Sequence, residues 1–131
     1  MMAGRFKYIV LALAIIGVGL LTRLSPPAHH ALLKYLGSAL WGSMVYCILA
    51  SFTPNANPVR IAVVAIVVAA GVEFSQLWHT EALDAFRATR LGVLLIGRFF
   101  SWWDIVSYSA GIAVIAAFDV IVLRQKFARA T

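Results

Sequence analysis

The chain has 131 residues, of which 63% are hydrophobic and only 12% charged, and its mean hydropathy is +0.92. A soluble globular protein is about 45–50% apolar and about 25% charged, and a chain this short has too little interior to hide so many apolar side chains from water. The composition therefore excludes an ordinary soluble domain and favours a protein whose apolar side chains face lipid.

Lipid offers the backbone no hydrogen-bond partners, so membrane-spanning segments are helices or closed barrels. A barrel strand alternates apolar and polar residues, whereas residues 9–21 and 61–72 contain no polar side chain. We therefore expect an all-α, polytopic membrane protein with four transmembrane helices. They form a single membrane domain over residues 1–131.

The first two spans are expected at residues 8–24 and 34–52. We interpret the first as a retained helix, because Ser25-Pro26-Pro27 after it does not resemble a signal-peptide cleavage site. In the second, small residues stand four apart in two pairs, Ser38 with Gly42 and Ala39 with Ser43. This spacing predicts close packing against another helix.

The third and fourth spans are expected at residues 60–78 and 102–123. The segment between them begins with the pattern of a short surface helix, in which Asp84 and Arg87 stand three apart. Residues 91–96 are apolar but far too few for the roughly 20 residues of a span. We expect a short interfacial or re-entrant segment there, with bends at Gly92 and Gly97.

The formal charge is +6 and the isoelectric point is about 10.1. The basic residues stand mostly beside the apolar runs, where Lys and Arg anchor helix ends and meet lipid phosphates. Membrane lipid is therefore the expected partner, and nucleic acid is not. Both ends of the chain are basic, so an even number of spans would place both termini in the cytoplasm. The numbers of basic residues at the two membrane faces are nearly equal, because five bases are expected at the other face: Arg23, Lys34, Arg87, Arg90 and Arg98.

Acids at membrane depth are costly and mark functional or paired positions. Glu73, Gln76 and Thr80 fall on one helical stripe, and a second stripe contains Asp104, Ser107, Tyr108 and Gly111. Both stripes belong to the end of the bundle where the third and fourth spans are joined. We predict a polar ligand-binding pocket at this membrane face, suited to a zwitterionic or anionic headgroup. Its lining residues would be Arg23, Lys34, Glu73, Gln76, Asp84, Arg87 and Asp104. The alternative is a network of ion pairs that only holds the helices together.

Asp119 stands about 15 residues beyond Asp104, hence about 22 Å along a helix. This places it near the opposite face, where we expect an interfacial ion pair with Arg124. The sequence has no nucleophile elbow, metal-ligand spacing, phosphate loop or dinucleotide fingerprint. We therefore expect no catalytic residue, metal site or cofactor. The alternative is that His79, near Glu73, acts as a general base. Cys47 is expected to be a small buried hydrophobe.

Two stretches, Val72–His79 and Leu83–Gly92, resemble a family of small bacterial membrane proteins, domain-of-unknown-function family 2809 (DUF2809). Tyr35–Trp41 and Trp103–Tyr108 match further blocks of its pattern. More loosely, the arrangement of Glu73, Gln76, Arg87, Asp104 and Gly111 is similar to that of VanZ-like membrane proteins, which are associated with the cell envelope. The resemblance implies a bacterial inner-membrane protein and a site region, but no reaction.

The chain departs from these patterns at two positions. The first family usually carries an acid where this chain has Ser38, which implies an altered activity if that acid belongs to a shared site. VanZ-like proteins usually have Asn where this chain has Tyr108.

The leading functional hypothesis is a membrane protein that binds a lipid headgroup or small polar ligand, without enzymatic activity. The second is an accessory subunit of a larger membrane complex, with membrane protein partners or a homo-oligomer. The third is a small transporter or membrane enzyme, in which Glu73 and Asp104 relay protons.

Overall fold

The computed structural model describes residues 2–23, 30–92 and 102–124, and every regular element within these ranges is a helix. The four longest are α1 (Met2–Arg23), α2 (His30–Phe52), α3 (Pro58–Ser75) and α6 (Trp102–Phe118), which continues as the π-helix η2 (Asp119–Arg124). All four are long and apolar enough to cross a membrane, with η2 included in the last. The expected all-α membrane protein with four spans is therefore confirmed.

The turn between α2 and α3 shows how the sequence ends one span and begins the next. The Thr53 hydroxyl donates to the Leu49 carbonyl oxygen at 2.8 Å and so closes α2. The Asn57 side chain then accepts from the Val59 backbone N–H at 2.9 Å, and Pro58 occupies the first turn of α3. A polar cap followed by Pro satisfies the free N–H groups of a helix start and fixes its φ.

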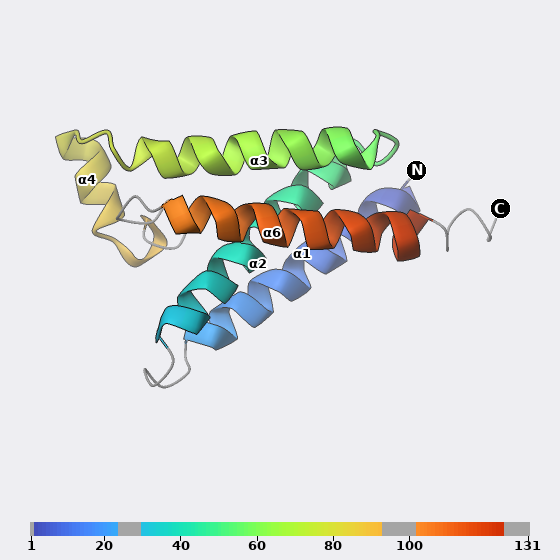
Figure 1. Ribbon diagram of the computed structural model, residues 1–131, viewed down its shortest axis with the longest axis horizontal. Helices are drawn as coiled ribbons and strands as arrows, with labels where there is room; N and C mark the ends of the chain where they lie inside the picture. Colours follow the sequence, from blue (N-terminus) through green and yellow to red (C-terminus); the bar gives the residue numbers. More distant parts are fainter. Residues whose placement is uncertain (1, 24–29, 93–101, 125–131) are drawn as a thin grey trace.

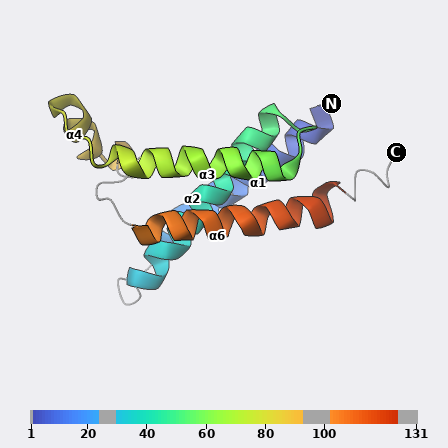
Figure 2. The same ribbon diagram turned by 45° about the horizontal axis from the view of Figure 1, so that its top comes forward.

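Helix α2 is the centre of the molecule, because it packs against α1, α3 and α6. Helices α3 and α6 run side by side, while α1 and α2 form an oblique pair against them (Figures 1 and 2). The buried apolar residues between these helices include Ala12, Tyr46, Ala65 and Ile112. Many other apolar side chains, such as Leu13, Val67 and Val114, are more than 60% exposed, as expected of a protein whose solvent is lipid.

The predicted close packing of α2 is confirmed, and its partner is α6. A Cβ added to Gly42 would lie 2.7 Å from the Tyr108 carbonyl oxygen, and one added to Gly111 would collide with the Ala39 backbone. The Ser43 hydroxyl donates to the carbonyl oxygens of Gly111, at 2.9 Å, and Ala39, at 3.0 Å. Small residues thus let two backbones touch, which is how helices associate in lipid.

Helix α3 ends at Ser75, before the expected end at residue 78. The chain turns after Gln76, and Thr80 begins a new helix, α4 (Glu81–Arg87), by accepting from the Leu83 N–H at 3.1 Å. The placement of Thr80 on one stripe with Glu73 was therefore wrong, because its side chain caps α4. The expected short helix is present, and it lies across one end of the bundle (Figure 1).

Gly92, which was expected to form a bend, is helical instead, as are residues 90 and 91. A Cβ at Gly92 would collide with the Phe86 carbonyl oxygen, so the chain passes this point only as glycine. The other expected bend, Gly97, and most of the expected re-entrant segment lie outside the described residues.

Candidate functional site

The first polar site joins three helices at the end of the bundle where α4 lies. Glu73, in the last turn of α3, has no exposed surface, and Asp104, in the first turn of α6, is 6% exposed. The Tyr108 hydroxyl donates to Glu73 Oε2 at 3.0 Å, and the Ser38 hydroxyl donates to Asp104 Oδ1 at 3.4 Å. We call Ser38, Glu73, Asp104 and Tyr108 the acid cluster.

Hydroxyl groups link the two carboxylates of the acid cluster. Tyr108 interacts with Ser38 as well as with Glu73, so the chain of contacts runs from the α3 acid through two hydroxyls to the α6 acid. The Tyr108 ring lies 5.1 Å from the Trp41 ring, centroid to centroid, which fixes its direction. The predicted convergence of the two stripes is therefore present between Glu73 and Tyr108.

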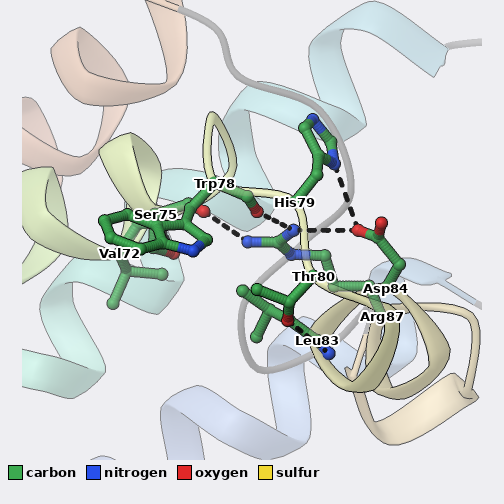
Figure 3. Close-up of polar contacts among 8 residues, drawn as sticks. All are labelled: Val72, Ser75, Trp78, His79, Thr80, Leu83, Asp84 and Arg87. Atoms are coloured by element: carbon green, nitrogen blue, oxygen red, sulfur yellow. Dashed lines mark hydrogen bonds and ion pairs between the residues drawn. The ribbon is translucent and has the colours of Figure 1, made fainter.

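The second group of polar side chains forms the corner between α3 and α4 (Figure 3). The guanidinium of Arg87 donates to the backbone carbonyl oxygens of Trp78, at 2.8 Å, and Ser75, and to Asp84 Oδ1 at 3.3 Å. Arg87 is only 3% exposed, whereas its partner Asp84 is exposed and also pairs with His79 Nδ1 at 3.1 Å. We call Arg87, Asp84 and His79 the arginine corner.

The arginine corner is mainly a cap for α3. The last carbonyl groups of a helix lack partners within the helix, and the fork of Arg87 satisfies carbonyl groups just where α3 ends. Among the described residues, the Nε atom of Arg87 has no hydrogen-bond partner. Arg87 and Asp84 thus hold the loop that precedes α4, and His79 is exposed and bonded to Asp84 rather than poised beside Glu73.

The predicted site residues therefore divide between two neighbouring groups. Glu73 and Asp104 belong to the acid cluster, Asp84 and Arg87 belong to the arginine corner, and Gln76 is buried in the turn between them. The side chains of Arg23 and Lys34 lie outside the part that the structure describes, although their helix positions place them at the same end.

Sequence reasoning missed two members of the acid cluster as partners of the acids. Ser38 was noted only as a small residue and as a departure from a family pattern, yet its hydroxyl contacts Asp104. Tyr108 was placed on the correct stripe, but its bond to Glu73 could not be predicted, because the relative rotation of α3 and α6 is not encoded in the spacing of residues. No group of three His, Cys, Asp or Glu side chains within the described ranges is arranged to hold a metal ion.

A further polar cluster lies at the opposite end of the bundle. Asp119 has no exposed surface and accepts hydrogen bonds from the hydroxyls of Tyr8 and Tyr46, each at 2.7 Å. Arg124 Nε donates to Asp119 Oδ2 at 3.2 Å. The expected ion pair with Arg124 is present, and the tyrosines of α1 and α2 that bury Asp119 are partners that the sequence did not predict.

The model of a family described as "Protein of unknown function (DUF2809)" matches residues 28–112 of the chain. The matched range contains all four residues of the acid cluster and the whole arginine corner, but neither Tyr8 nor Asp119. No solved structure matches the chain. The similarity to VanZ-like proteins stays a prediction.

Proposed function

The chain belongs to the DUF2809 family, and on the geometry of its acid cluster we propose that it binds the ammonium group of a zwitterionic lipid headgroup or small polar ligand. The observation that carries this proposal is the pairing of Glu73 and Asp104, two buried carboxylates from different helices bridged by hydroxyl groups.

Charge is the first argument for an ammonium ligand. Carboxylates at membrane depth are expensive when ionised, and two of them near each other repel. Within the described residues, Asp104 contacts a hydroxyl and forms no ion pair. A ligand ammonium group would supply positive charge and N–H donors at one site.

The position of the acid cluster is the second argument. Around it, Trp78, Trp102 and Trp103 are 65–70% exposed, and tryptophan is enriched where hydrocarbon meets headgroups. Phe74 packs edge-on against Trp102, with ring centroids 5.6 Å apart. These exposed tryptophans support a position of the acid cluster close to the level of the lipid headgroups.

The arginine corner supports a zwitterionic ligand rather than a purely anionic one. The guanidinium of Arg87 is already engaged by two carbonyl oxygens and Asp84, so it is poorly placed to take an anion. The exposed Arg90, one turn further on, remains in reach of headgroup phosphates at the surface.

We further propose that the protein lies in a bacterial cytoplasmic membrane with both termini in the cytoplasm, so that the acid cluster faces the cell envelope. Both ends of the sequence are basic, with Arg5 and Lys7 at one and Arg124, Lys126 and Arg129 at the other, and this supports the orientation under the positive-inside rule.

The test is retention of phosphatidylethanolamine by the purified chain, measured by native mass spectrometry against phosphatidylglycerol of the same acyl chains. We expect Glu73→Gln and Asp104→Asn each to lower phosphatidylethanolamine binding about tenfold, because a charge-assisted hydrogen bond is lost. The matched control is Glu81→Gln, which removes an exposed acid of α4 at the same end. Wild-type binding in both acid-cluster variants would refute the proposal.

A further inference from the structure

The described part of the fourth span ends in a helix of a different kind. α6 is α-helical as far as Phe118, and η2 continues it as a π-helix over Asp119–Arg124. In a π-helix the backbone N–H groups bond to carbonyl groups five residues earlier, and such turns are rare and frequently mark functional sites. The first and last residues of η2 are the acid and the base that pair with each other. We call the Asp119–Arg124 ion pair the latch.

The spacing of the two latch residues suits a π-helix better than an α-helix. Residues of an α-helix advance by about 100° each, so two side chains five positions apart point about 140° away from each other. In a π-helix, by contrast, residues five positions apart lie nearly above one another. The π register therefore brings Arg124 Nε to within 3.2 Å of Asp119 Oδ2.

The Asp119 carboxylate is held in place by helices other than its own. It has no exposed surface, and the hydroxyls of Tyr8 in α1 and Tyr46 in α2 each donate to it at 2.7 Å. A buried charge is costly unless an opposite charge pairs with it, and Arg124 supplies that charge. Because the acid is fixed by two other helices, the turn that carries Arg124 adapts its register to reach it.

We infer that η2 is a two-state element, which the latch holds in the π register and which becomes α-helical when the latch is broken. The change turns the Arg124 side chain away from Asp119. It also moves the Leu123 carbonyl oxygen, to which Lys7 Nζ of α1 donates at 3.4 Å. Breaking one ion pair therefore alters the contact between the first and the last span, and η2 is a conformational device built into the bundle.

The experiment uses the full chain, purified in mild detergent, with nitroxide labels on two introduced cysteines and electron paramagnetic resonance as the readout. The reporter pair is Phe118→Cys with Leu123→Cys, five positions apart, whose labels lie close together only in the π register. The reference pair is Val114→Cys with Phe118→Cys, four positions apart within α6, whose labels are neighbours in an α-helix. Cys47 is buried, and the chain without introduced cysteines gives the labelling background.

We expect the reporter pair to show dipolar broadening in the otherwise native chain and to lose it on Arg124→Gln and on Asp119→Asn. Arg124→Lys keeps the positive charge opposite Asp119 and should keep the broadening. The matched control is Tyr46→Phe, which removes a hydrogen bond from the same carboxylate but leaves the ion pair, and it should also keep the broadening. The reference pair should be unchanged in every variant, which shows that α6 remains folded.

Three results would overturn the latch. The first is absence of broadening from the reporter pair in the otherwise native chain, and the second is broadening that persists in both Arg124→Gln and Asp119→Asn. The third is an equal loss in Tyr46→Phe and Arg124→Gln, because the register would then follow the stability of the whole cluster. If Asp119→Asn also loses the reference signal, Arg124→Gln carries the test. Asp104→Asn should leave both pairs unchanged, so failure of the acid-cluster proposal does not affect this one.

Discussion

Asp119 shows how a single acid is accommodated inside a membrane bundle. Its two carboxylate oxygens accept from Tyr8 and Tyr46, which come from different helices, and Arg124 supplies the opposite charge. Burial of a charge is costly unless it is paired and hydrogen-bonded, and here both conditions are met. Removal of any one partner therefore leaves a polar group exposed to an apolar surrounding.

A double-mutant cycle can measure how much the hydrogen bond between Tyr46 and Asp119 contributes to the free energy of unfolding. We expect Tyr46→Phe to lower the free energy of unfolding by about 1–2 kcal/mol, because a hydrogen bond to a charged group is lost within lipid. In the Asp119→Ala background the same change should cost at least about 0.5 kcal/mol less, since the acceptor is already gone. Unfolding in mixed detergent micelles gives the four values, and strictly additive losses would contradict the coupling.

Among the elements, the contact between α2 and α6 decides how closely the helices of the bundle approach. Gly42 and Gly111 each face the backbone of the other helix, and the Ser43 hydroxyl bridges them through the Gly111 carbonyl oxygen. Both helices also contribute to the acid cluster, through Ser38 and Asp104. A change in their separation therefore affects stability and site geometry together.

Gly111→Ala tests this contact, with Gly17→Ala as the control. A methyl group at residue 111 has no space against Ala39, so we expect a loss of about 1–3 kcal/mol in unfolding free energy. A methyl group at residue 17 meets nothing within 4 Å, and its effect should stay within about 0.5 kcal/mol. Thermal unfolding in detergent compares the two, and equal shifts in Tm would mean that the helices do not touch at Gly111.

The sequence was informative about elements and less so about their partners. Apolar run length predicted four spans, and the spacing of Ser38 with Gly42 predicted a close contact on α2, because both signals are local. The end of α3 was misplaced because Thr80 satisfies the start of α4 instead of continuing the helix. The bond between Tyr8 and Asp119 joins residues 111 positions apart, and no local pattern encodes the helix rotations that create it.

For the whole molecule, the arrangement of the helices places the start of α1 and the end of η2 at one end and α4 at the other (Figures 1 and 2). Gly4 lies beside the α2–α3 turn, since a Cβ on it would be 3.6 Å from Pro54. With four spans, the arginine corner and the Asp119 cluster of Tyr8, Tyr46 and Arg124 must therefore face opposite sides of the membrane.

Cysteine labelling tests this topology directly. Cys47 is buried, so the native chain should give little background with a membrane-impermeant maleimide. We expect Glu81→Cys, on α4, and Arg5→Cys, on α1, to be labelled from opposite sides of sealed vesicles, because both side chains are exposed at opposite ends. Labelling of both from the same side would contradict a four-span arrangement, and the unsubstituted chain gives the baseline.

The long separation between Tyr8, Tyr46 and Asp119 has a consequence for biosynthesis. The two tyrosines are synthesised and inserted well before Asp119, so their hydroxyls wait in the membrane until the last span arrives. Closure of the bundle is therefore a late event that depends on the final helix, and a chain stalled before residue 119 would present unsatisfied hydroxyls within lipid. Such a half-made product lacks the acceptor that both tyrosine hydroxyls share in the finished protein.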